Sequence, residues 1–283
     1  MAWLVLALPS PSAGASQSVQ LSATLTPEHL GYGTNVGFEF TVSAPDGHVP
    51  APLTGVELGY PENLGIALSG LGLETCDHKT LEAVGLSGCP PNSRMGVGAA
   101  LAEIPVGPTV VREPADVAIV RAATTDGHVA MLFYVNGEAP VIAHLVLAGL
   151  LLPAVPPFGG SIGIDVPLVP GLPEGPNVSV VHLRVTIGPE HLTYYERVGG
   201  KMVSYTPKGI LLPKVCPSGG FRFSGVFRFA DGSQAGAETT VPCPLESSAA
   251  RRARRCHRPR GAKGSRHGRA CEAGRPRGRN DSR

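Results

Sequence analysis

The sequence predicts an all-β protein made of antiparallel β-sandwich modules, with one short helix and a basic C-terminal tail. Two observations support this fold class. Apolar residues alternate with polar ones over long stretches, and turn pairs that contain glycine separate those stretches. A period of two places every second side chain on one face, which is typical of half-buried strands. Alternating strand–helix units are absent from the sequence, which argues against a parallel sheet.

The first 15 residues are interpreted as a signal peptide. Met1–Leu8 is a short apolar stretch, and Ala13-Gly14-Ala15 supplies a cleavage site of small residues. The positive charge that usually precedes the apolar stretch is missing, which an upstream start codon would explain. The alternative is an ordinary buried strand. We expect the mature chain to be secreted, extracellular or part of the cell envelope.

Residues 17–73 are predicted to form an N-terminal β-sandwich module of immunoglobulin-like type. Between residues 36 and 42 every second residue is Val or Phe, with Gly, Glu and Thr between them. Asp46-Gly47 follows this stretch, and such a pair tolerates the positive φ angles that tight hairpin turns require. This segment therefore favours paired antiparallel strands.

Residues 74–245 are predicted to form a larger, hairpin-rich β module. Val117–Ala123 and Val129–Val135 flank Asp126-Gly127, and Asn136-Gly137 is expected to be the next turn of a three-strand meander.

Other elements of this module are expected from shorter patterns. Thr75–Val84 is predicted to be a helix, capped by Thr75 and ended by the glycine at position 85. Leu192–Val198 and Met202–Tyr205 are expected to form a hairpin, and Pro153–Pro176 a long connection. Val141–Leu152 is about 12 residues long, short of the roughly 20 that a membrane helix needs. It is interpreted as a buried strand pair, and no transmembrane span is predicted.

The four cysteines of the body are predicted to form two local disulfides, Cys76–Cys89 and Cys216–Cys243. Cysteines in an exported, turn-rich chain are usually crosslinks. The first pair encloses 12 residues and the second encloses 26. Other connectivities are possible for four cysteines, and a metal site is the competing idea. The spacing lacks a Cys-x-x-Cys motif or a nearby histidine pair, which argues against a metal.

The second cysteine pair encloses an alternating stretch. Phe221, Phe223, Gly225, Phe227 and Phe229 share one face, and a hairpin turn at Asp231-Gly232 is expected to follow them. Cys243 is four residues out of register with Cys216 for a two-residue turn. A wider loop, or bulges at the glycines, must absorb the difference.

The segment Cys89-Pro-Pro-Asn-Ser93-Arg-Met-Gly96 resembles a Cys-Pro-x-x-Ser-x-x-Gly motif of uncharacterised exported β-rich proteins from high-GC Gram-positive bacteria. In that group the motif follows an upstream cysteine and precedes a run of hairpins. The resemblance covers residues 74–245. It implies secretion and β architecture, and it implies no activity.

A Gly-x-Ser-x-Gly pattern at residues 159–163 places Ser161 as a candidate nucleophile. A nucleophile elbow requires this motif between a strand and a helix, whereas strand-like alternation follows it here. Asp165 with His182 or His191 would complete a triad in chain order. The alternative interpretation of this motif is an ordinary glycine-rich turn without a catalytic role. The sequence predicts no catalytic, cofactor-binding or metal-ligating set.

The C-terminal residues 246–283 have almost no large apolar side chains, so disorder is expected. Residues 251–283 carry a net charge of +11, against −9 for residues 1–250. This asymmetry predicts binding to an anionic cell-wall polymer or membrane surface. Missing aromatic residues argue against specific nucleic-acid binding. The alternatives are a solvated tail without a role, or a coding artefact. The predicted binding arginines are Arg251, Arg252, Arg254, Arg255, Arg275, Arg277 and Arg279.

The leading functional hypothesis is therefore a non-enzymatic secreted or cell-envelope β-sandwich protein with a structural, adhesive or ligand-binding role. Two alternatives remain. One is a secreted serine hydrolase that uses Ser161. The other is a carrier of an apolar ligand, suggested by the apolar run at Val141–Leu152. The oligomeric state is not predicted.

Overall fold

A computed structural model describes the central part of the chain. The predicted signal peptide, three short internal segments (67–68, 138–142 and 172–174) and the whole predicted tail, with its seven arginines, lie outside the described residues. The described ranges are residues 17–66, 69–137, 143–171 and 175–244.

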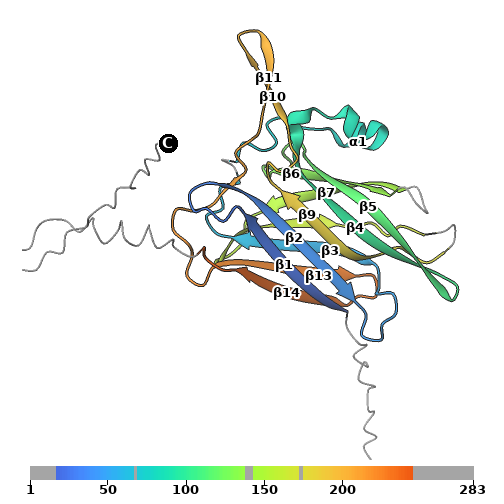
Figure 1. Cartoon of the computed structure of the whole chain (residues 1–283). Helices are drawn as coiled ribbons and strands as arrows, with labels where there is room; N and C mark the ends of the chain where they lie inside the picture. The colour runs from blue at the N-terminus through green and yellow to red at the C-terminus, as the bar shows by residue number, and fades with distance from the viewer. Residues whose placement is uncertain (1–16, 67–68, 138–142, 172–174, 245–283) are drawn as a thin grey trace, which may run out of the picture. The chain divides into compact units, whose positions relative to one another are not determined.

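Eleven of the described strands form one nearly closed antiparallel sheet, in which the first and last strands, β1 and β14, also lie next to each other (Figure 1). A short strand, β12 (Ile210–Leu211), adds to β2 outside this order. In sheet order the strands are β1 Ser18–Thr26, β2 Gly33–Ser43, β9 Ser179–Ile187, β4 Arg94–Val106, β5 Thr109–Arg121, β6 Ala130–Gly137, β7 Ala143–Leu152, β8 Phe158–Asp165, β3 Leu53–Pro61, β13 Phe221–Phe229 and β14 Gln234–Val241.

The boundary predicted between residues 17–73 and 74–245 is wrong. Strand β2 pairs with β9, and β3 pairs with both β8 and β13, so strands of the two predicted modules alternate within one sheet. The described residues up to Cys243 form one compact unit. An immunoglobulin-like sandwich is therefore not confirmed, although the all-β class is. Alternation fixes which face of a strand is buried, but it does not say which distant strand supplies its hydrogen bonds.

The interior is filled by the alternating residues that the sequence analysis identified. Phe38 of β2 packs edge-on against Phe223 of β13, with ring centroids 5.3 Å apart. Phe40 and Phe227 repeat this contact at 4.9 Å. All four rings are at most 4 % exposed. These contacts join β2 and β13 across the interior, so the nearly closed sheet encloses the main core.

The helix prediction is correct in place but wrong at its start. Helix α1 spans His78–Val84, and the side chain of Asp77, not Thr75, accepts the backbone N–H of Thr80 at 3.1 Å. The backbone N–H of Cys76 donates to Arg121 of β5, so residues just before the cap are held to the sheet. The predicted stop at Gly85 is confirmed, with φ at 70°. Two 3₁₀ turns follow, η1 (Gly85–Gly88) and η2 (Pro91–Ser93).

None of the described helices has the length and apolar character needed to cross a membrane.

Three local predictions differ from the structure. Asn136-Gly137 belongs to β6 and pairs with β7, so it is not a turn. The predicted strand pair at Val141–Leu152 is the single strand β7, with residues 141–142 outside the described ranges. Pro153–Pro176 contains strand β8 and is not one long connection.

The hairpin predicted across Gly199-Gly200 is confirmed as β10 (Tyr194–Val198) and β11 (Lys201–Tyr205), which project beyond the main sheet (Figure 1). Its base is fixed by the buried Tyr194, whose hydroxyl accepts from the N–H of Gly72 at 2.8 Å and donates to the carbonyl of Arg94.

Candidate functional site

Both predicted disulfides are present, Cys76–Cys89 and Cys216–Cys243, with Cα–Cα distances of 5.2 and 5.9 Å. The second closes the open end of the β13–β14 hairpin, in which Phe221 faces Val241. A turn at Pro217–Gly220, with two glycines at positive φ, brings Cys216 back over Cys243. This turn absorbs most of the predicted register offset.

The first disulfide packs against a small core beside the main one. Cys76 and Cys89 lie with Leu81 of α1 and with Val120 and Leu132 of the sheet. Both crosslinks therefore hold local structure together. Disulfides of this kind persist in oxidising compartments, which fits a non-cytosolic, extracellular setting.

The environment of Ser161 differs from a nucleophile elbow. Ser161 is 4 % exposed and lies in the middle of strand β8, paired with Gly59 and Leu152. No helix opens after it, since β8 continues to Asp165. The motif is therefore part of a buried strand, and the alternative prediction of a glycine-rich turn is wrong as well.

The predicted partners of Ser161 are engaged elsewhere. The Asp165 carboxylate lies 3.5 Å from the guanidinium of Arg228. His182 is on β9, and four strands separate β9 from β8 in the sheet order. His182 Nε2 and Glu39 Oε1 are 2.8 Å apart. The structure does not bring the predicted triad together.

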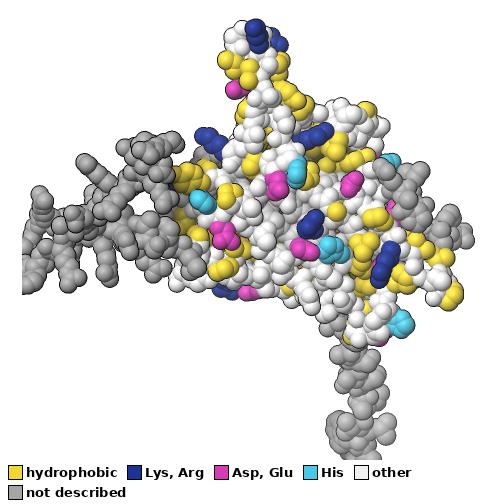
Figure 2. Space-filling view, viewed as in Figure 1, with side chains coloured by type: hydrophobic (Ala, Val, Ile, Leu, Met, Phe, Trp, Pro, Cys, Tyr) yellow, Lys and Arg dark blue, Asp and Glu magenta, His cyan; other side chains and the backbone are white. Residues whose placement is uncertain are grey.

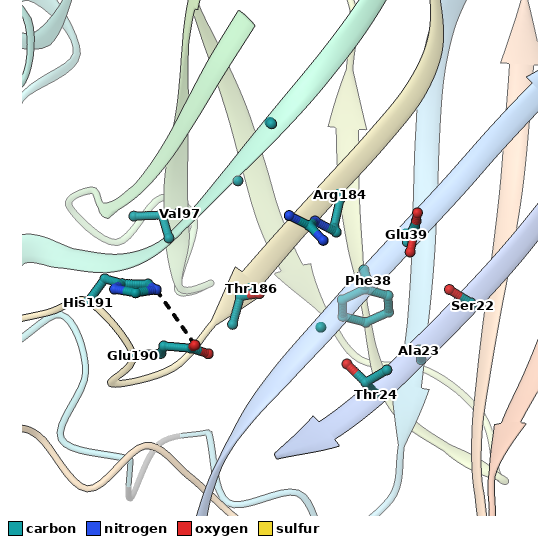
Figure 3. A pocket seen from close by; sticks show the side chains of 13 residues that line it. Ser22, Ala23, Thr24, Phe38, Glu39, Val97, Arg184, Thr186, Glu190 and His191 are labelled. Carbon is teal, nitrogen blue, oxygen red and sulfur yellow. Dashed lines mark ion pairs between the residues drawn. The ribbon is translucent and has the colours of Figure 1, made fainter. Parts of the chain in front are cut away.

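A polar groove lies on the outer face of four neighbouring strands, β1, β2, β9 and β4, and has a volume of about 510 Å³. Figure 3 shows its side chains, with Glu190 and His191 at one end and Ser22 and Glu39 at the other. Side chains of both charge signs and histidines gather on this face of the molecule (Figure 2). The residues that line it are Ser22, Ala23, Thr24, Gly37, Phe38, Glu39, Val97, Gly98, Ala99, Arg184, Thr186, Glu190 and His191.

Strand register places the polar groups of the groove in two rows. Ser22, Glu39 and Arg184 are directly opposite one another on β1, β2 and β9. Thr24 and Thr186 form the adjacent row, with Gly37 between them. In antiparallel pairs opposite residues point to the same side, so these side chains converge on the outer surface.

Gly37 keeps the floor of the groove open. A Cβ at this position would overlap the hydroxyl oxygen of Thr24, so any larger residue would displace that hydroxyl. The end of the groove is set by the turn after β9, where the N–H of Glu190 donates to Asn35 Oδ1 at 3.0 Å. The Glu190 carboxylate and His191 Nε2 are 3.6 Å apart.

The groove carries charge of both signs. The Arg184 guanidinium is exposed and makes no ion pair within 4.0 Å among the described residues, whereas Glu39 and Glu190 each contact a histidine. From the sequence, the outward positions of these strands were predicted only as the solvent side of an alternating pattern. Their convergence depends on β1–β2–β9 register, which no local signal reveals.

In the part of the chain that the structure describes, no three His, Cys, Asp or Glu side chains are grouped closely enough to hold a metal ion. Comparisons with family models, curated proteins and solved structures found no match for this chain.

Proposed function

We propose that this chain is a non-enzymatic, exported binding protein whose outer groove holds a neutral, polyhydroxylated ligand such as a saccharide. The observation that carries this proposal is the in-register row Ser22–Glu39–Arg184 beside the threonine row. Carboxylates accept hydrogen bonds, guanidinium groups donate them, and hydroxyls do both. A ligand rich in hydroxyls can satisfy all three kinds of group together.

The charges favour a neutral ligand over an ion. An anion would approach the carboxylates of Glu39 and Glu190, and a cation would approach the guanidinium of Arg184. The volume of about 510 Å³ lies within the roughly 300–1,000 Å³ that small-ligand sites occupy. Because the groove is open to water, we expect affinities in the micromolar to millimolar range.

Two substitutions test this site. Arg184→Ala removes the central donor, and Thr186→Val removes a hydroxyl while keeping the shape of the side chain. Arg222→Ala is the matched control, because Arg222 is on β13 and pairs with Glu238 at 2.8 Å outside the groove. A glycan array followed by calorimetry should show binding to wild type and Arg222→Ala, and at least tenfold weaker binding to the other two. Equal binding by all four proteins would refute the groove as the ligand-binding site.

The hydrolase alternative is tested separately by a screen of esterase and glycosidase substrates with wild type and Ser161→Ala. The buried strand position of Ser161 supports the expectation that any hydrolysis is at background level and the same in both proteins. A measurable activity that the substitution abolishes would overturn the non-enzymatic proposal.

A further inference from the structure

A second space, separate from the groove, lies on the inner side of the sheet. It has a volume of about 100 Å³ and is lined by strands β4 to β7, by β9, by Leu53 of β3 and by the segment that follows β8. Its described lining is small and apolar with one exception, Glu113. The other lining residues are Leu53, Ala100, Ala102, Ala115, Val135, Gly137, Ala143, Leu145, Val166, Pro167, Val169, Pro170, Gly171, Val178 and Val180.

The sequence leaves this space because the inward positions at one end of the sheet are small. Register places Ala100, Ala115, Gly137 and Ala143 in one row across β4, β5, β6 and β7. Two rows further along the same strands, the inward residues include Ile119 and Phe133, which fill the core. Small side chains facing one another cannot close the gap that the larger ones fill.

Glu113 is the only titratable residue in the described lining. It projects from β5 opposite Ala102, is 6 % exposed, and its Oε1 has no hydrogen-bond partner among the described residues. Burial raises the pKa of this carboxyl above its ordinary value. A Cβ at Gly137 would overlap Oε1, so the absence of a side chain at this glycine leaves the space that the carboxyl occupies. An unpaired buried carboxyl oxygen is costly, which points to a partner that the described residues do not supply.

We propose that this cavity binds the ammonium group of a small unbranched alkylamine, which donates to Glu113 while its alkyl chain contacts the alanine and valine walls. An ammonium group supplies both the charge and the hydrogen-bond donors that a desolvated carboxylate lacks. The net charge of −9 on residues 1–250 attracts cations toward this body. The site is independent of the outer groove and of its saccharide.

The dimensions restrict the ligand further. The space is small, about 100 Å³, so the proposed ligand is a short unbranched amine and not a large aromatic one. A carboxylate ligand is excluded because it would meet the Glu113 carboxylate without a counter-ion in the described lining.

The test uses the full-length protein and three probes that share one carbon chain: n-butylammonium chloride, 1-butanol and sodium butyrate. Each is titrated while amide signals of β5 and β6 are followed by NMR. We expect n-butylammonium to bind at least tenfold more tightly than 1-butanol, and butyrate not to bind. Equal affinity for the amine and the alcohol, or no binding by any of them, would overturn the proposal.

Two variants locate the site. Glu113→Gln keeps the shape but removes the charge, and Ala143→Leu keeps the charge but fills the space. Both should weaken n-butylammonium binding at least tenfold, with folding checked by thermal melting. Glu57→Gln removes an exposed carboxylate on β3 and should leave binding unchanged. Unaltered binding in Glu113→Gln, or in a folded Ala143→Leu, would contradict the assignment.

Discussion

Glu113 and Gly137 lie on neighbouring strands, and the carboxyl of the first occupies the space where the second would carry a side chain. Because β5 and β6 pair with Ala115 opposite Gly137, the carboxyl of Glu113 leans across that row. The relationship explains how the carboxyl of an inward-facing glutamate fits at this end of the sheet. It also makes the pair sensitive to single substitutions.

Gly137→Ala should destabilise the protein by about 1–3 kcal/mol, since the added methyl overpacks the carboxyl. Thermal melting measures the effect. Gly163→Ala is the matched control, because a Cβ there meets only Leu152 Cδ1, at an ordinary 3.6 Å. This control should be neutral or slightly stabilising, by roughly 0.4–1 kcal/mol, since it restricts the unfolded chain. Equal loss of stability in both variants would show that Gly137 and Glu113 do not compete for space.

Glu113→Gln should stabilise the protein, and the gain should grow with pH. Burial raises the pKa of the Glu113 carboxyl in the folded state, so the folded protein holds this proton more tightly than the unfolded chain does. Wild-type stability therefore falls as pH rises from the unfolded pKa, about 4.3, through the folded one. Melting temperatures at pH 4 should be similar for the two proteins and should diverge by pH 8. A constant difference over that range would contradict this explanation.

Non-reducing peptide mapping of exported protein should recover Cys76–Cys89 and Cys216–Cys243 as the only pairs among these four cysteines. Each local crosslink contributes about 3–4 kcal/mol in the chain-entropy model. Reduction should therefore lower the melting temperature by several degrees or more. Free thiols at these positions, or crossed pairs, would show the predicted connectivity to be wrong in the native protein.

Truncation after Pro244 tests the proposed role of the basic tail. The removed residues include the 13 basic side chains of 251–283, which give this segment its charge of +11. Binding of full-length protein to anionic vesicles or wall polymer should weaken steeply with salt and should vanish on truncation. The melting temperature should stay the same. Equal binding by the full-length and truncated proteins would show that the tail does not hold the protein to anionic surfaces.

Much of the fold was predictable from local pattern. The phenylalanines of β13 and the Val and Phe residues of β2 are buried as their alternation predicts, and the disulfides connect the predicted cysteines. Local spacing suffices for these features because each depends on residues less than about 30 positions apart.

The sheet order and the candidate sites were not predictable, because both depend on long-range pairing. Arg184 lies opposite Glu39 only because β9 inserts between β2 and β4, strands that are far from β9 in the sequence. Ser161 shows the opposite case. The Gly-x-Ser-x-Gly motif is present in the sequence, but the serine lies inside strand β8. Glu113 gave no signal, since a single carboxylate in an alternating segment is normally solvated.

The most direct test of the proposed saccharide groove is NMR mapping with the best ligand from the glycan array. The amides of Thr24, Gly37 and Thr186 and the side-chain N–H of Arg184 should shift on titration, because they belong to adjacent rows of one groove. Amides of β7, which β5 and β6 separate from β4 in the sheet order, should not shift. Shifts that map away from β1, β2, β9 and β4, or that persist in Arg184→Ala, would contradict the groove as the binding site.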